Sequence, residues 1–152
     1  MEQTKYIYTK FILNNGGYIK MNKSDIKKCN KVTLICHAIT CGLISGAYLI
    51  EVLKGSRNIA YFAVISLLGL GPVIVEVIMY RRTPESDILR KVIAYSYAVL
   101  YTVAVFTTYS KLPFTYILPM IIVITLYGDL SYCTKIGVGG VLINVADVVY
   151  RF

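Results

Sequence analysis

The sequence predicts an all-α fold, a polytopic integral membrane bundle of about five transmembrane helices. Hydrophobic residues make up 57% of the 152 residues and the mean hydropathy is +0.63, above the roughly half-apolar composition of soluble domains. Only 16% of the residues are charged, and the charges gather at a few places along the chain. The apolar runs between those places approach the ~20 residues that cross a bilayer.

Five segments follow from these runs, at residues 32–53, 58–80, 92–109, 114–127 and 136–150. The first two are continuous apolar stretches, and the third is interrupted by Tyr and Thr but carries no charge. The fourth is short, and the fifth contains Asn144 and Asp147. The chain thus divides into a basic segment, 1–31, and a helical bundle, 32–152. The first apolar run begins too late and is too long for a cleaved signal peptide.

The distribution of Lys and Arg predicts the orientation, because cytoplasmic loops carry the excess of these residues. Seven precede the first segment, four lie in the second loop and one lies in the fourth, against four on the other side. Those four are Lys54, Arg57, Lys111 and Arg151. We therefore expect a multi-pass protein of the bacterial inner membrane, with a cytoplasmic N-terminus and its basic loops against the lipid headgroups.

The N-terminal stretch contains a second plausible start. Residues 1–20 are rich in Tyr and Lys and contain the turn signal Asn14-Asn15-Gly16-Gly17. Met21 then opens a segment in which Ser24 is a plausible helix cap, with Asp25 beside it at the favourable end of the dipole. We expect Met21 to be the true start and residues 1–20 to be a mis-assigned leader.

Small residues and prolines predict how the helices pack. Ala38, Gly42 and Gly46 recur at four-residue spacing, a pattern that lets two backbones approach closely in lipid. We expect this face to pack within the chain, with a homodimer as the alternative. Pro72 and Pro119 each remove a backbone donor, so each is expected to kink its helix.

Four ionisable residues fall inside the predicted segments, where such groups are the first candidates for function. Glu51, Glu76 and Asp147 each lie about one turn from a helix end and near a cation, so we expect them to reach the membrane interface. The alternative is a proton or ligand site. His37 is expected to be a hydrogen-bonded packing residue, with a sensing role as the alternative.

Several classes of function are disfavoured by the sequence. Soluble catalytic signatures are absent, so no catalytic residue is assigned and we expect no enzyme and no cofactor. His37 and Cys41 share a helix face, but two ligands fall short of a metal site. The net charge of +8 lies in short loops rather than on a soluble domain, which argues against nucleic acid as a partner.

Tyr and Thr are frequent in the third and fourth segments. Tyr97 and Tyr101 share one helix face, and Tyr101 sits in mid-helix, where its hydroxyl needs a partner. The pattern favours hydrogen bonds between helices, and a small-molecule pocket is the alternative. Asp129 follows Tyr127-Gly128 in a tight loop, and we expect it to form a cap or a salt bridge to Lys135 or Arg90.

Residues 21–150 resemble a known family of membrane regions. The matching stretches are Tyr-Ala-Val-Leu-Tyr at 97–101, Phe-Thr-Tyr-Ile-Leu-Pro at 114–119, Leu-Tyr-Gly-Asp at 126–129 and Lys-Ile-Gly-Val-Gly-Gly-Val-Leu-Ile-Asn at 135–144. They are similar to the N-terminal multi-helix region of clostridial methyl-accepting chemotaxis proteins and of related membrane diguanylate cyclases. In that family six helices precede a cytoplasmic output domain. The sequence departs from this pattern, because it has no sixth helix and no heptad-rich segment.

The resemblance implies a sensory input module, separated from its output domain, whose small-molecule ligand is unknown. By analogy, the ligand-binding or sensing candidates are Tyr101, Tyr116, Tyr127, Asp129 and Asn144. Two other functions stay open from the residues themselves. One is a small transporter with Glu51 or Glu76 as a proton-coupled site. The other is an accessory membrane protein that binds a partner helix through the Gly42 and Gly46 face.

Overall fold

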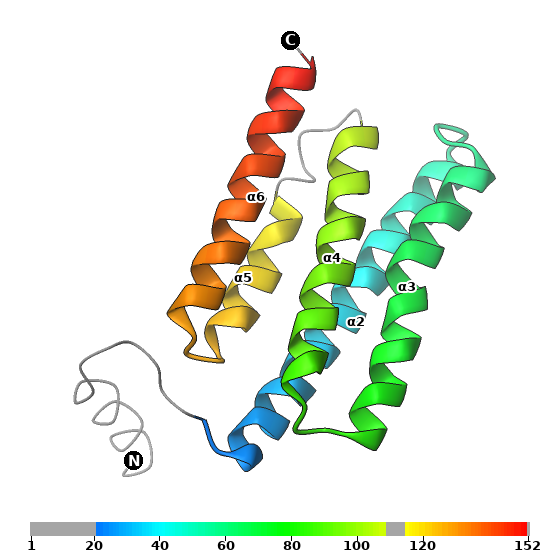
Figure 1. Ribbon diagram of the computed structural model, residues 1–152. Helices are drawn as coiled ribbons and strands as arrows, with labels where there is room; N and C mark the ends of the chain where they lie inside the picture. Colours follow the sequence, from blue (N-terminus) through cyan, green and yellow to red (C-terminus); the bar gives the residue numbers. More distant parts are fainter. Residues whose placement is uncertain (1–20, 109–114, 152) are drawn as a thin grey trace, which may run out of the picture.

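The computed structural model describes residues 21–108 and 115–151, so the predicted leader lies outside the described residues. The described residues form helices and loops without a β-strand. The helices, in chain order, are α2 (Lys23–Leu53), α3 (Ile59–Arg82), α4 (Asp87–Thr107), α5 (Ile117–Thr125) and α6 (Leu130–Arg151). Consecutive helices run in opposite directions (Figure 1), and the pairs α2–α3 and α3–α4 pack most extensively.

Four of these helices, α2, α3, α4 and α6, are long and apolar enough to cross a membrane. The predicted all-helical fold is therefore confirmed, and four of its helices have the length and composition that a multi-pass membrane protein needs. The fourth predicted segment differs, because α5 has only nine residues. At 1.5 Å per residue it covers about 14 Å, less than half of a ~30 Å hydrocarbon core.

The cations gather at one end of the bundle. We call this the basic end; it contains the starts of α2, α4 and α6, and its cations are Lys23, Lys27, Lys28, Lys31, Arg81, Arg82, Arg90 and Lys91. The opposite end, which we call the far end, contains the α2–α3 loop and the C-terminal end of α6 (Figure 1). The clustering agrees with the charge asymmetry from which the orientation was predicted.

Polar side chains at the loops start the helices. Asn22 accepts a hydrogen bond from the Asp25 amide at 2.8 Å, so Asn22 is the N-cap of α2 and the assignment of Ser24 was wrong. Asn58 and Ser86 cap α3 and α4 in the same way. Because such a cap satisfies otherwise unpaired amides, α2 can begin at Lys23, nine residues before the apolar run.

Among the described glycines of the four long helices, Gly69 of α3 lies closest to two neighbouring long helices. A Cβ built there would lie 3.4 Å from Leu100 of α4 and 3.5 Å from Cys41 of α2. Gly42 and Gly46, in contrast, have nothing within 4 Å of a built Cβ. The expectation that their face packs within the chain was therefore wrong, and Gly69 takes that role.

The prolines act differently from one another. α3 continues as one α-helix on both sides of Pro72. Pro119 is the third residue of α5, in the first turn, where a missing amide costs no intrahelical bond. The expected mid-helix kink at Pro119 is therefore wrong, because the helix starts later than the apolar run.

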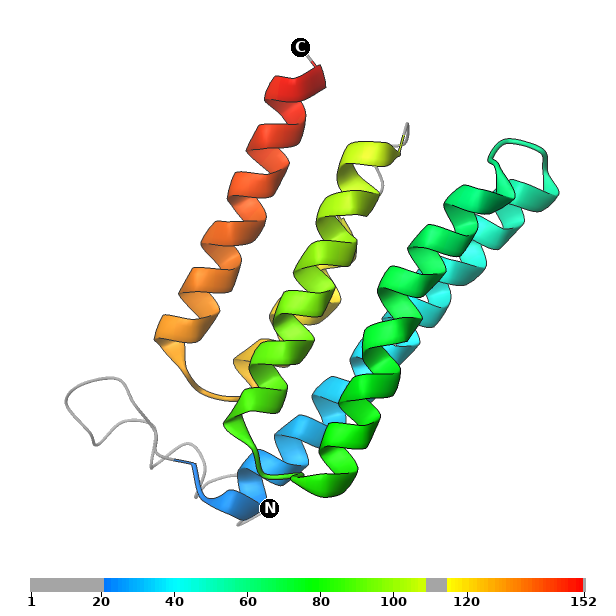
Figure 2. The same cartoon turned by 45° about the vertical axis from the view of Figure 1, so that its right-hand side comes forward.

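The buried core lies between α2, α3, α4 and α5, whereas α6 covers one side of α4 and α5 (Figure 2). Gly140 is the only buried residue within α6, and it packs on the tip of Ile117. Valines and leucines cover the remaining surface of α6 and are exposed. This surface suits contact with lipid tails.

Candidate functional site

Two side chains that can carry a charge at neutral pH, His37 and Glu76, are fully buried in the described chain. His37 Nδ1 lies 2.7 Å from Glu76 Oε2, and the two side chains are 1% and 0% exposed. Ser96 Oγ lies 2.7 Å from the other carboxyl oxygen, Oε1. The three side chains come from α2, α3 and α4, so the His37–Glu76–Ser96 cluster joins three antiparallel helices.

The sequence places these residues at one depth. His37 follows Lys31 by six residues, Glu76 precedes Arg81 by five, and Ser96 follows Lys91 by five. At 1.5 Å per residue, each lies about 8–9 Å inward from its basic neighbour. Tyr97 covers the imidazole ring edge-on, with ring centroids 5.6 Å apart.

The expectations for the four intramembrane ionisable residues have different outcomes. Glu76 does not reach the interface, so that expectation was wrong; its hydrogen bonds to His37 and Ser96 satisfy it inside the bundle. His37 is a buried, hydrogen-bonded residue as expected. Glu51 pairs with Arg57 at 3.4 Å and Asp147 pairs with Arg151 at 2.8 Å, so both lie with cations at the far end, as expected.

A second site is a cavity of about 360 Å³ between α4, α5 and α6. Its volume lies in the range of small-molecule pockets, and its walls are mainly apolar. The polar side chains that line it are four tyrosines and one lysine: Tyr95, Tyr97 and Tyr101 from α4, and Tyr132 and Lys135 from α6. Lys135 is exposed, and no carboxylate of the described chain forms an ion pair with it.

Hydrogen bonds between helices fix the walls of this pocket. Tyr101 donates to Asn144 Oδ1 at 2.7 Å, which ties α4 to α6, and the Tyr97 hydroxyl donates to the Tyr116 backbone oxygen. The predicted hydrogen-bonded seam is therefore present, and a pocket lies beside it. Of the five sensing candidates, Tyr101 lines the pocket, Asn144 holds Tyr101, and Tyr116 contributes a carbonyl.

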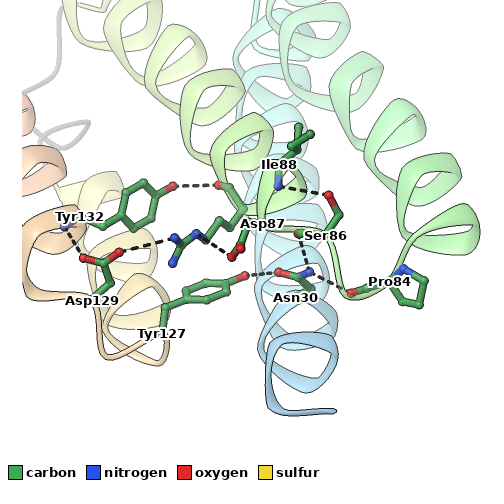
Figure 3. Close-up of polar contacts among 9 residues, drawn as sticks. Asn30, Pro84, Ser86, Asp87, Ile88, Tyr127, Asp129 and Tyr132 are labelled. Atoms are coloured by element: carbon green, nitrogen blue, oxygen red, sulfur yellow. Dashed lines mark hydrogen bonds and ion pairs between the residues drawn. The ribbon is translucent and has the colours of Figure 1, made fainter. Parts of the chain in front are cut away.

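The other two candidates, Tyr127 and Asp129, lie at the basic end (Figure 3). Tyr127 donates to Asn30 Oδ1 at 2.8 Å, and the Asn30 amide donates to the carbonyls of Pro84 and Ser86 at 2.9 and 3.0 Å. The buried Asn30 thereby holds the α3–α4 loop and the α5–α6 loop against α2. Neither Tyr127 nor Asp129 lines the pocket.

Asp129 combines the two structural roles expected of it. Its Oδ1 accepts from the Tyr132 amide at 3.0 Å at the start of α6, and its Oδ2 lies 3.5 Å from Arg90 Nη2 (Figure 3). The Arg90 guanidinium also lies over the rings of Tyr127 and Tyr132, at 5.5 and 5.1 Å from their centroids. Lys135, the other expected partner of Asp129, forms no ion pair with it among the described residues.

The sequence singled out neither Asn30 nor Ser96. Counting residues inward from the basic loops would have placed Ser96 level with His37 and Glu76. Asn30 lies one residue before Lys31 in a run of lysines, where a polar residue attracts no notice. Within the described residues no group of three His, Cys, Asp or Glu side chains is arranged to hold a metal ion.

The chain was compared with protein-family models, with curated proteins and with solved structures, and none of them matches it.

Proposed function

We propose that the chain is a membrane-embedded sensory input module of a bacterial chemotaxis-type receptor. The observation that carries the proposal is the pocket between α4, α5 and α6. Its walls come from the segments that resemble chemotaxis-receptor membrane regions, and they include Tyr101 from the candidate set. A ligand there would contact both α4 and α6, and would therefore change how α6 is held.

The walls suggest the chemistry of the ligand. Apolar side chains form most of the surface, so an apolar body fits best. The unpaired ammonium of Lys135 at the wall favours an anionic group at one end of the ligand. Decanoate has both properties, and decanol has the same chain without the charge.

A receptor chimera tests the proposal. Residue 151 is joined through one further transmembrane helix to the signalling domain of a chemotaxis receptor, and kinase output is measured with decanoate and with decanol. We expect decanoate to change the output and Gly139→Leu, which fills the pocket wall, to abolish the change. Gly137→Leu is the matched control, because Gly137 lies on the same helix outside the pocket and is equally open at Cβ.

Two results would contradict the sensor proposal. Decanoate could bind the wild-type protein in nanodiscs without changing the chimera output, which would leave a binding protein and no sensor. Alternatively, Gly137→Leu and Gly139→Leu could behave alike, which would place the effect of decanoate in the lipid.

The burial of Glu76 favours a second candidate function, that of a small proton-coupled transporter. That function requires a carboxyl group deep in the bundle, and Glu76 is 0% exposed. A proton-driven solute flux into proteoliposomes that is lost in Glu76→Gln and kept in Glu51→Gln would support it. A flux unaffected by Glu76→Gln would count against it.

A further inference from the structure

The hydrogen bonds of the His37–Glu76–Ser96 cluster have a property that the sensor proposal does not require. Each of its polar contacts can be made in more than one protonation state. Both carboxyl oxygens of Glu76 have a partner, and Ser96 Oγ has two acceptors in reach, Glu76 Oε1 at 2.7 Å and the Ile93 carbonyl at 3.0 Å. A hydroxyl has one proton to donate, so Ser96 must choose between them.

With one titratable proton on the Nδ1–Oε2 contact, the cluster has no net charge. The proton lies either on His37 Nδ1, giving an ion pair, or on Glu76 Oε2, which then donates to Nδ1. In both arrangements Ser96 donates to Oε1, and the 2.7 Å contacts remain hydrogen bonds. An apolar interior favours these forms, because an uncompensated charge there is costly.

A second proton can also be accommodated. When His37 is charged and donates to Oε2, the added proton takes its place on Oε1 and donates to Ser96 Oγ. Ser96 then turns its own hydroxyl to the Ile93 carbonyl. Loss of one proton from the neutral cluster, the one on His37 Nε2, leaves a neutral imidazole that donates from Nδ1 to the carboxylate, with Ser96 again donating to Oε1. Every form keeps the three helices joined.

The surroundings contain few competing groups. Cys41 on α2 lies close enough to interact electrostatically with Glu76, and Tyr97 on α4 contacts the imidazole ring. The hydroxyl of Tyr97 is engaged with the Tyr116 carbonyl. α5 packs against α2 but has no titratable side chain. The nearest cations along the helices, Lys31, Arg81 and Lys91, lie about 8–9 Å towards the basic end.

We propose that the His37–Glu76–Ser96 cluster is a proton-binding site inside the membrane, which gains and loses a proton as pH changes while α2, α3 and α4 keep their hydrogen bonds. Ser96 serves as the positioning residue that reverses its donor direction. The site does not depend on either function proposed above.

The chain offers a direct test, because His37 is its only histidine. Labelling with ¹⁵N-histidine therefore gives imidazole signals from one residue. In the full chain in nanodiscs, we expect the two ¹⁵N shifts to move between neutral and charged positions within about pH 4–9, a range that covers the ordinary Glu and His values. Infrared difference spectra of the same samples report the protonated carboxyl group.

Variants assign the signals. Ser96→Ala removes the reversible partner, and we expect it to move the titration midpoint by at least about half a pH unit while the helical content is unchanged. Glu76→Gln should abolish any carboxyl band of the site, whereas Glu51→Gln, at the far end, should not. The proposal is overturned if the folded wild-type protein shows neither a ¹⁵N shift change nor a carboxyl change over this range. It is equally overturned if Ser96→Ala titrates as the wild type does, and neither result requires Glu76→Gln to fold.

Discussion

The Tyr127 hydroxyl donates a hydrogen bond to Asn30 Oδ1 at 2.8 Å, across 97 positions of sequence. Both side chains are buried, at 2% and 0% exposure. Through Asn30 the bond also reaches the α3–α4 loop, so two loops and the start of α2 share one polar centre (Figure 3).

Removing this hydroxyl should loosen the basic end. We expect Tyr127→Phe to lower the free energy of unfolding by about 1–2 kcal/mol, because Asn30 Oδ1 loses its donor while buried. Unfolding by SDS in mixed micelles measures the change. Tyr150→Phe, at an exposed position of α6, is the matched control and should leave the midpoint where it is. Equal losses in both variants would show that the bond contributes nothing.

Tyr127 also predicts an alkaline transition. Burial is the largest cause that raises the pKa of this phenol to about 12 in the folded chain, against about 10 when unfolded. Because the folded pKa is raised, the contribution of the neutral phenol is complete below about pH 10 and is lost as pH rises through 12. We expect the SDS unfolding midpoint to fall as the pH is raised from 9 to 12, and to fall less steeply in Tyr127→Phe than in the wild-type protein. Parallel curves would contradict the assignment.

A larger side chain should affect stability differently at Gly69 of α3 and at Gly42 of α2. We expect Gly69→Leu to cost about 1–3 kcal/mol of stability, because its side chain meets Leu100 and Cys41. Gly42→Leu adds the same volume on an open face and should leave the monomer as stable as before. The SDS titration ranks the three proteins. Should Gly42→Leu prove the more damaging, the exposed face must be occupied by a partner helix.

Arg151 joins α6 to the C-terminal end of α4. Its Nη2 donates to the carbonyls of Val105 and Thr108 at 2.8 and 2.7 Å, while its Nε bonds Asp147. We expect Arg151→Gln to speed hydrogen exchange of amides in the last turn of α6, because charge-assisted bonds of about 1.5–3 kcal/mol are lost. Lys54→Gln, at an exposed position of the same end, serves as the control. If hydrogen exchange in Arg151→Gln is unchanged, Arg151 does not hold α6 to α4.

The predicted orientation can be tested by labelling. In a cysteine-free background, Ser56→Cys lies in the far-end loop and Glu85→Cys in a basic-end loop. We expect a membrane-impermeant maleimide added to intact cells to label Ser56→Cys and to spare Glu85→Cys, because basic loops stay in the cytoplasm. Opened cells should expose both. The reverse pattern would invert the topology.

Much of the fold follows from the sequence because apolar length and charge position act locally. Long apolar runs with few charges predicted the long helices, and the nearness of a cation in the sequence agreed with the Asp147–Arg151 pair. The start of α5 could not be predicted, because residues 114–116 carry no charge that would separate them from the helix that follows. Hydropathy alone gives no sign of where the helix begins.

The candidate site was harder to predict, because a single helix gives no information about its neighbours. Glu76 has two arginines within two turns, so an interface position was a reasonable expectation. The alternative partners, His37 and Ser96, belong to other helices. Pairing antiparallel helices by depth from their basic ends would have aligned all three residues, although it would not have fixed which faces meet.

The exposed surface of α6 has an energetic consequence. Lipid tails solvate its valines and leucines as well as protein does, so burying them gains almost nothing and cannot attach the helix. Attachment rests on Tyr101–Asn144, on the Tyr132 hydroxyl donating to the Arg90 carbonyl, and on Arg151. At about 0.6–2 kcal/mol for each link, the total is a few kcal/mol. We therefore expect α6 to separate from its neighbours at a lower free-energy cost than α2 from α3, so small changes beside α6 should shift that balance.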